Sequence, residues 1–268
     1  MPSFNIDFMG NRRIMFAISA VLLVISIGAL GIRGLRFGIE FQGGTVINVT
    51  DAGTVTETQM AKAFADAVKV AKSTGLKADS FQVTTIGPGW GKNITNSAIL
   101  AFGLSILAIL LYVSLRFEYK MSVTAVIALI HDITITLGIY ALAGLEVTPN
   151  TVAALLTILG YSLYDTIVVF HRIKENSQGL VKQSFMSMAN ESINEVLIRS
   201  INTTLTSLIP VLVMLFFGGS TLKDFAFALS IGLFVGAYSS IGVAAPLFAI
   251  WKETEPKYKA LAKKFAST

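Results

Sequence analysis

Six long apolar segments constrain this chain more than any other feature of its sequence. A transmembrane helix needs about 20 mainly apolar residues, and each segment reaches or approaches that length. The segments lie at 14–32, 94–115, 121–143, 150–171, 199–217 and 225–250. Only 14% of the residues are charged, whereas a soluble globular protein carries about 25%. The sequence therefore predicts an α-helical polytopic membrane protein with six transmembrane helices, the first of them uncleaved.

Basic residues are distributed unevenly between the links that join these segments. Cytoplasmic loops of membrane proteins carry the excess of lysine and arginine. One side of the predicted membrane carries Arg12, Arg13, Arg116, Lys120, Arg172, Lys174, Lys182 and the five lysines that follow Trp251. On the other side, the link 144–149 carries none and the link 217–224 carries only Lys223. We therefore expect a multi-pass protein of the cytoplasmic (inner) membrane with both termini in the cytoplasm. The net charge of +5 then reflects orientation in membrane lipid and not nucleic-acid binding.

The segment 33–93 is the one sizeable polar stretch, and we expect it to form a small extracytoplasmic α+β domain between helices 1 and 2. Alternating β-branched residues predict a strand from Thr45 to Thr50, and Ser80 to Ile86 predicts a second. Helical spacing predicts a helix from Thr56 to about Lys72. A core of this size is marginal alone, so we expect the domain to lean on the membrane part or on a partner. The predicted domains are 1–32, 33–93, 94–251 and a basic cytoplasmic tail at 252–268.

The cytoplasmic link 172–198 is too polar to cross a membrane, yet its apolar residues follow helical spacing. We expect either an amphipathic helix at the membrane surface or a solvated helical hairpin, and the pattern favours neither. Elsewhere, two rows of small residues at intervals of four predict close helix packing or a contact with a partner subunit. These rows are Ser97, Ala101 and Ser105, and Gly232, Gly236 and Ser240.

Two acidic residues, Asp132 and Asp165, lie inside the predicted transmembrane helices. An ionisable group in a bilayer costs about 3 kcal/mol on insertion scales, so it normally faces protein or water and is often functional. Thr157 and Tyr161 share one helix face with Asp165. His131 precedes Asp132, and one side of the fifth helix carries Arg199, Asn202, Thr203 and Thr206 near its start. We infer a buried polar seam among the third, fourth and fifth helices.

A carboxylate in such a seam suits proton transfer. Burial favours the protonated form of the acid, whereas a nearby arginine favours the ionised form. If helix movement brings Arg199 toward Asp165 and away again, proton release is coupled to shape. The drive is about 2.3 kcal/mol per proton per 100 mV and about 1.4 kcal/mol per pH unit. The alternative is structural, because Asp165 and Arg199 could form a pair that only holds two helices together. His131 could likewise be an ordinary hydrogen-bonded core histidine.

Several functional classes lack the residues that they require. The chain has no cysteine and only two histidines, forty positions apart, so we expect neither a disulfide nor a metal centre. The glycines from Gly38 to Gly44 lack the lysine and the helix of a phosphate-binding loop. We therefore expect no enzyme and no cofactor, with the proton as the coupling ion.

Five motifs together resemble the SecD/SecF family of protein-export membrane proteins, within the resistance-nodulation-division superfamily. The resemblance runs through nearly the whole chain, and the fourth motif is the most specific. The motifs are Phe37 to Thr45 (FGIEFQGGT), Ala128 to Asp132 (ALIHD), Leu145 to Pro149 (LEVTP), Thr157 to Phe170 (TILGYSLYDTIVVF) and Arg199 to Thr204 (RSINTT).

The resemblance implies six spans with an extracytoplasmic domain between the first two. It implies a complex with SecD, association with the SecY channel complex and with YajC and YidC, and proton-motive-force-dependent help to preproteins that leave the channel. By motif position, Asp165 matches the proton-relay carboxylate of the family, Arg199 the arginine of the next helix, and Asp132 the aspartate of the His-Asp pair. A monovalent cation in place of the proton remains open.

The chain departs from the family pattern at His171, Glu195 and Trp90, where aspartate, glutamine and an uninterrupted glycine-proline motif are usual. Because of these departures, the net charge at the cytoplasmic ends of the membrane helices stays open. Two other functions also stay open: a half-size proton-driven exporter of small molecules or lipids, and a non-transporting membrane scaffold. Exporters of this fold usually have two six-span halves, and this chain supplies one.

Overall fold

A computed structural model describes residues 6–42, 44–49, 81–86 and 88–265. Among these residues, six helices are long and apolar enough to cross a membrane. They are Arg12–Arg33, Trp90–Arg116, Tyr119–Ala143, Pro149–Asn176, Phe185–Phe217 and Leu222–Glu253. The prediction of six spans is confirmed, and each predicted segment lies within or close to one of these helices.

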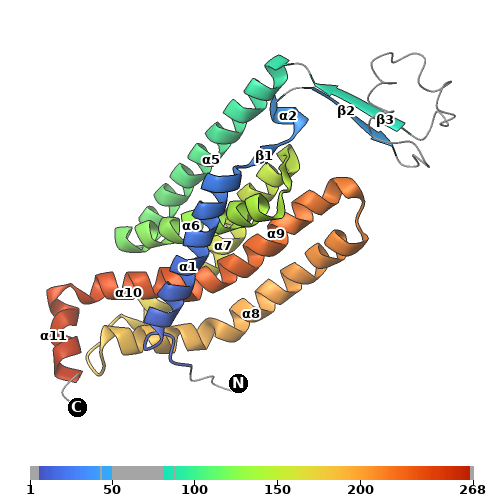
Figure 1. Cartoon of the computed structure of the whole chain (residues 1–268). Helices are drawn as coiled ribbons and strands as arrows, with labels where there is room; N and C mark the ends of the chain where they lie inside the picture. Colours follow the sequence, from blue (N-terminus) through green and yellow to red (C-terminus); the bar gives the residue numbers. More distant parts are fainter. Residues whose placement is uncertain (1–5, 43, 50–80, 87, 266–268) are drawn as a thin grey trace, which may run out of the picture. The chain divides into compact units, whose positions relative to one another are not determined.

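The elements follow the chain in the order drawn in Figure 1. They are α1 (Arg12–Arg33), β1 (Arg36–Phe37), α2 (Ile39–Gln42), β2 (Gly44–Val49), β3 (Phe81–Ile86), α5 (Pro88–Arg116), α6 (Tyr119–Ala143), β4 (Glu146–Val147), α7 (Pro149–Asn176), α8 (Phe185–Phe217), α9 (Ser220–Ser239), the π-helical turn η2 (Ser240–Ala244), α10 (Ala245–Glu253) and α11 (Pro256–Phe265). The chain divides into two compact units, Met1–Arg36 with Ala98–Thr268, and Phe37–Ser97.

The smaller unit contains an antiparallel strand pair. β2 and β3 pair in a register that runs from Gly44 opposite Ile86 to Val49 opposite Phe81. Both strands match the strands predicted from alternating residues. The predicted helix at 56–72 lies outside the described residues. α5 begins at Pro88, six residues before the predicted second span. Proline is well tolerated at the first position of a helix, so it can start α5 there.

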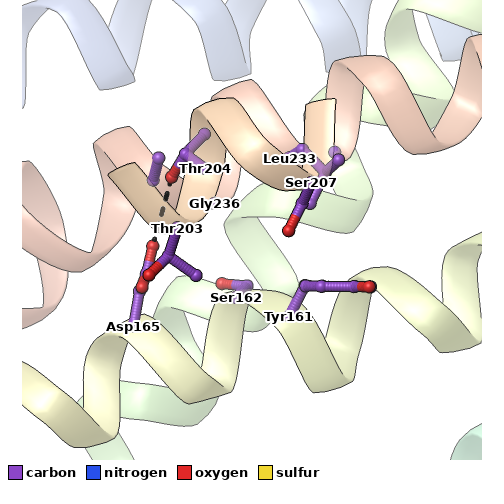
Figure 2. Close-up of a pocket in the computed structure, with 10 residues that line it drawn as sticks. Tyr161, Ser162, Asp165, Thr203, Thr204, Ser207, Leu233 and Gly236 are labelled. Carbon is purple, nitrogen blue, oxygen red and sulfur yellow. Dashed lines mark hydrogen bonds between the residues drawn. The ribbon is translucent and has the colours of Figure 1, made fainter. Parts of the chain in front are cut away.

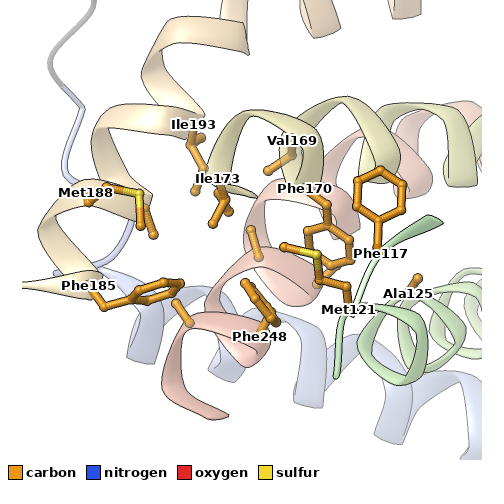
Figure 3. Packing of buried hydrophobic residues seen from close by; sticks show 14 of the residues in the cluster. Phe117, Met121, Ala125, Val169, Phe170, Ile173, Phe185, Met188, Ile193 and Phe248 are labelled. Carbon is orange, nitrogen blue, oxygen red and sulfur yellow. The ribbon is translucent and has the colours of Figure 1, made fainter. Parts of the chain in front are cut away.

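The larger unit is a helix bundle with an aromatic core at the end where α1 begins (Figure 3). Phe170 of α7 and Phe185 of α8 both pack on Phe248 of α10, with ring centroids 5.4 and 5.9 Å apart. Ala189 and Ile193 of α8 continue this buried surface and are 0% exposed. The apolar stripe of α8 therefore faces protein and not lipid headgroups.

This packing corrects the interpretation of the link 172–198. α7 continues to Asn176, a short turn follows, and α8 begins at Phe185 and runs unbroken through the fifth span. Ser184 caps the start of α8 by accepting a hydrogen bond from the Ser187 backbone N–H. Neither a separate surface helix nor a solvated hairpin forms, because the apolar positions of this segment complete the bundle core.

Glycine allows the closest helix contacts in the bundle. A Cβ on Gly232 of α9 would lie 2.2 Å from Ile158 of α7, and a Cβ on Gly236 would lie 2.9 Å from the Ser162 Cβ. The predicted row of small residues on the sixth span thus marks a real packing surface. α9 also packs against α8, so it contacts both of the helices that carry the candidate site (Figure 1).

The row on the second span has a different environment. Ser97 is exposed, and much of α5 beyond it is exposed as well. Ala101 and Ser105 of the same row are half-buried.

Candidate functional site

Asp165 lies on α7 with its side chain directed toward α8 (Figure 2). The residue is only 7% exposed. Thr204 Oγ1 of α8 lies 3.5 Å from Asp165 Oδ2 and 2.9 Å from the Ser200 carbonyl oxygen. The single hydroxyl hydrogen of Thr204 is better placed to bond to the Ser200 carbonyl oxygen than to Asp165. The Asp165 carboxylate can therefore still accept further hydrogen bonds. The buried Ser200 Oγ has no hydrogen-bond partner among the described residues.

A small cavity adjoins this carboxylate. Its volume is about 10 Å³, at the lower limit for a single water molecule. The cavity lies where α7, α8 and α9 meet (Figure 2). Its lining includes Tyr161, Ser162, Asp165, Thr203, Thr204, Ser207, Leu233 and Gly236. A buried acid beside a water-sized space with several hydroxyl groups can take up and release a proton.

Asp132 of α6 has a different and fully satisfied environment. The residue is 0% exposed. Its Oδ2 accepts hydrogen bonds from the Ser162 Oγ of α7 at 2.6 Å and from the Ser239 Oγ of α9 at 2.8 Å. Its Oδ1 lies 2.9 Å from the Nδ1 of His131. Three partners on three helices therefore hold one carboxylate in place.

His131 is buried beside this carboxylate, as a hydrogen-bonded core histidine would be. Its second ring nitrogen, Nε2, has no hydrogen-bond partner among the described residues. The ring lies 6.5 Å from that of Tyr238. The Tyr238 hydroxyl donates to the Met15 carbonyl oxygen and lies 3.1 Å from Ser19 Oγ, both on α1. The polar cluster thus reaches from α6 toward α1.

Arg199 does not contact Asp165 in this structure. It is exposed, and its Nη2 donates to the Tyr164 hydroxyl at 3.3 Å. Tyr164 directly precedes Asp165 on α7 but is exposed, so the guanidinium group is held on a neighbouring, exposed face of that helix. Arg172 lies outside the seam and pairs with Glu195 and Glu175. Glu195, a departure noted in the sequence, therefore serves as an ion-pair partner that links α7 to α8.

Other predicted seam residues lie on the outer side of the bundle. Thr157, Tyr161 and Tyr164 line an open groove of about 520 Å³, together with Gly160 and Thr203. Asn202 and Thr206 of α8 are exposed, and the Thr206 hydroxyl donates to the Asn202 carbonyl oxygen. The predicted seam therefore divides into a buried part and an exposed groove.

One feature of the seam was predicted wrongly, and three serines were missed. Asp132 contacts the fourth and sixth spans through Ser162 and Ser239, and not the fifth. Ser162 lies three residues before Asp165, on the same helix face. Ser239 adjoins the small-residue row of the sixth span, and that row signalled which face of α9 packs on α7. Ser200, beside Arg199, carried no signal of burial in the sequence.

Among the described residues, no three His, Cys, Asp or Glu side chains gather where they could hold a metal ion.

Family models match two parts of the chain. The model described as "Protein export membrane protein SecD/SecF, C-terminal" matches residues 66–254, which include both candidate acids. The model described as "SecD/SecF GG Motif" matches residues 28–50. The chain belongs to the SecD/SecF family. The resemblance carried by the five sequence motifs is thereby confirmed.

Individual members of the SecD/SecF family support the same assignment. The chain is 42% identical to protein translocase subunit SecF of Streptomyces coelicolor, over 96% of this chain and 80% of that protein. It is 36% identical to protein translocase subunit SecF of Desulfurispirillum indicum, over 97% of each. It is also 36% identical to protein translocase subunit SecDF of Thermus thermophilus, over 94% of this chain and 39% of that protein.

A solved structure of the family has the same fold. The crystal structure of SecDF from Thermus thermophilus, described as a translocon-associated membrane protein, superposes with a TM-score of 0.84 at 35% identity. The match covers 94% of this chain and 39% of that one. A second SecDF crystal structure, in a super-membrane-facing form, gives a TM-score of 0.76 at 32% identity. The mostly helical architecture with six spans is therefore that of a multi-pass membrane protein of this family.

Proposed function

We propose that this chain is an accessory subunit of the Sec protein-export machinery, which uses the proton motive force with SecD to promote preprotein translocation across the cytoplasmic membrane. The Sec role is supported by relatives named protein translocase subunit SecF and SecDF. The use of the proton motive force is supported by one observation in particular. Asp165 is a buried carboxylate in a transmembrane helix, with incomplete hydrogen bonding and a water-sized cavity beside it.

In the proposed cycle, Asp165 binds a proton and Arg199 responds to its charge. When Asp165 is protonated, Arg199 rests on the Tyr164 hydroxyl, as in this structure. When Asp165 loses its proton, the carboxylate attracts the guanidinium group across the α7–α8 contact. The membrane potential supplies about 2.3 kcal/mol per proton per 100 mV, which biases such an equilibrium strongly. The proton is the coupling ion, and the proposal includes no cofactor and no catalytic site of its own.

The basic links support an orientation with both termini in the cytoplasm. The segment 33–93 is then an extracytoplasmic α+β domain, and its direct connection to α1 and α5 makes it the proposed moving part. SecD is the proposed partner, because one relative joins SecD and SecF in a single polypeptide. The SecY channel complex, YajC, YidC and the preprotein are further proposed partners from family membership. The exposed groove at Tyr161 and Tyr164 is a candidate surface for SecD.

The substitution Asp165→Asn tests this proposal. Asparagine keeps the shape of the side chain but cannot release a proton, so the stimulation of export by the proton motive force should be lost. Export of a preprotein into inverted membrane vesicles, measured with and without the proton gradient, gives the result. Co-purification with SecD and an unchanged melting temperature show that the variant is intact. Glu191→Gln, the same acid-to-amide change at an exposed position near the start of α8, should retain the stimulation.

Two outcomes would favour other functions. Full proton-dependent export by the Asp165→Asn variant, and by a double variant with Arg199→Gln, would indicate a scaffold in which the seam is only structural. Purification without a SecD-like partner, together with drug sensitivity after deletion, would indicate an exporter of small molecules or lipids.

A further inference from the structure

Ser162 lies between the two buried acids and contacts the surroundings of both. Its Oγ donates to Asp132 Oδ2 at 2.6 Å. Its side chain also lines the cavity beside Asp165. No other residue within the described part of the chain both bonds to Asp132 and lines that cavity. Ser162 therefore joins two sites that the sequence suggested only as neighbours in one seam.

We propose that the cavity holds one water molecule and that this water and the Ser162 hydroxyl form a proton path between Asp165 and Asp132. The path rests on the proposed function, since it takes Asp165 as the residue that exchanges protons. It adds a water site, a relay hydroxyl and a second proton acceptor. Asp132 is then a temporary proton store and not a separate entry point.

The spacing of the two residues on α7 fits a single water. Ser162 and Asp165 are three residues apart on one helix face, so their Cβ atoms lie about 5–6 Å apart. Two hydrogen bonds of about 2.8 Å through one water bridge such a gap. A buried water needs two to four polar partners. Asp165 and Ser162 both line the cavity and supply two such partners.

The hydrogen-bonding capacity of Ser162 also fits. A serine hydroxyl has one hydrogen and two lone pairs. The hydrogen is used on Asp132, so the lone pairs are available to accept a hydrogen bond from the water. Asp165 can accept further hydrogen bonds as well, because its contact with the Thr204 hydroxyl is long at 3.5 Å.

The transfer is balanced in atoms and charge. Protonated Asp165 gives its proton to the water oxygen, and the water gives another proton to Ser162 Oγ. Ser162 releases its original hydrogen to Asp132 Oδ2. The result is an ionised Asp165, an intact water, an intact serine and a protonated Asp132. Only O–H bonds form and break.

The charged and titratable groups around the path are few. His131 of α6 faces Asp132. Tyr161 of α7 lines the cavity, and Arg199 of α8 donates a hydrogen bond to the Tyr164 hydroxyl outside the cavity lining. α9 contributes Gly232, Leu233, Gly236 and Ala237 to the cavity, and none of these titrates. Arg199 is therefore the one cation among these groups that can move toward the ionised Asp165.

Two serine variants form a matched test. Ser162→Ala and Ser239→Ala each remove one buried hydroxyl from the same oxygen of Asp132. Only Ser162 also lines the Asp165 cavity. The whole chain is reconstituted with SecD in proteoliposomes, and proton release is followed after a pH jump. The path predicts that Ser162→Ala slows release by about a hundredfold relative to Ser239→Ala, because a relay hydroxyl is lost in only one of them.

A spectroscopic readout separates a relay from a merely structural serine. The infrared C=O band of protonated Asp165 is assigned by its loss in Asp165→Asn. It should shift in Ser162→Ala, because the water beside Asp165 loses its acceptor, and should stay in place in Ser239→Ala. Melting temperatures of both variants control for folding.

The outcomes distinguish the path from the proposed function. Equal release rates in the two serine variants, with an unmoved Asp165 band, would overturn the path while Asp165→Asn still abolishes proton-dependent export. If Asp165→Asn retains that export, the proposed function fails, and the path fails with it.

Discussion

Glu255 anchors a group of ion pairs where α6 begins and α10 ends. Its Oε1 lies 2.8 Å from Lys120 Nζ and 3.0 Å from Lys252 Nζ, and Lys252 also pairs with Glu118. Burial opposes ionisation of this carboxyl, but the hydrogen bonds from Lys120 and Lys252 outweigh it and hold the pKa of Glu255 below its ordinary value of 4.5. The network therefore ties the first turn of α6 to the end of the sixth span.

The lowered pKa of Glu255 predicts a pH dependence of stability. A depressed pKa contributes stability that is complete above the unfolded pKa of 4.5 and is lost as pH falls through the folded value. The melting temperature of the wild type should therefore fall on acidification below that pH, and Glu255→Gln should remove part of the fall. Glu253→Gln, two residues earlier, is the matched control. An identical pH profile in wild type and Glu255→Gln would contradict this account.

Single residues also show what the sequence could and could not predict at the site. Asp132 and Asp165 were identifiable because charge inside an apolar run is costly. Ser162 and Ser239 were not, because serine is common and inexpensive in membrane helices and its partner depends on tertiary packing. The contact of the exposed Arg199 with Tyr164 could not be predicted from the sequence either. Residue spacing indicates a helix face but not the direction of a side chain.

At the scale of elements, α1 and α6 make one of the closest contacts in the bundle. A Cβ on Gly138 of α6 would lie 2.2 Å from Ser26 Cβ and 2.5 Å from Ser26 Cα of α1. A flexible side chain could rotate away from an added methyl group at position 138, but the backbone of α1 cannot. This contact matters for function because α1 leads directly to the segment proposed to move.

Gly138→Ala should therefore destabilise the protein. Forcing one methyl group into this packed contact costs about 1–3 kcal/mol and pushes α1 away from α6. Thermal unfolding of the purified chain gives the measurement. Gly28→Ala on α1, where a Cβ would meet nothing within 4 Å, is the matched control. A melting temperature of Gly138→Ala equal to that of Gly28→Ala would show that the two helices are not packed this tightly.

The elements themselves were largely predictable from length and hydrophobic pattern. The six spans and the strand pair β2–β3 follow from rules of length and alternation. α8 was predicted less well, because its polar first half resembles a surface segment in isolation. Its apolar positions Phe185, Ala189 and Ile193 are buried only because α7 and α10 supply the facing surface. Whether these apolar positions face protein or solvent therefore depends on tertiary contacts.

At the scale of the whole molecule, the chain corresponds to 39% of the SecDF polypeptide that it resembles. Asp165 sits close to an exposed groove that carries Tyr161, Tyr164 and Thr203. Polar groups on the outer face of a membrane bundle are costly in lipid, so a partner that covers them is favoured. The proposed proton cycle is accordingly a property of the complex with SecD, and its tests use that complex.

Proton movement through this complex tests the central claim most directly. The chain and SecD are reconstituted in proteoliposomes with a pH-sensitive dye inside, and a proton gradient is applied across the membrane. The account predicts proton flux with the wild-type chain and flux at the level of protein-free vesicles with Asp165→Asn. Equal flux with wild type and Asp165→Asn would contradict it.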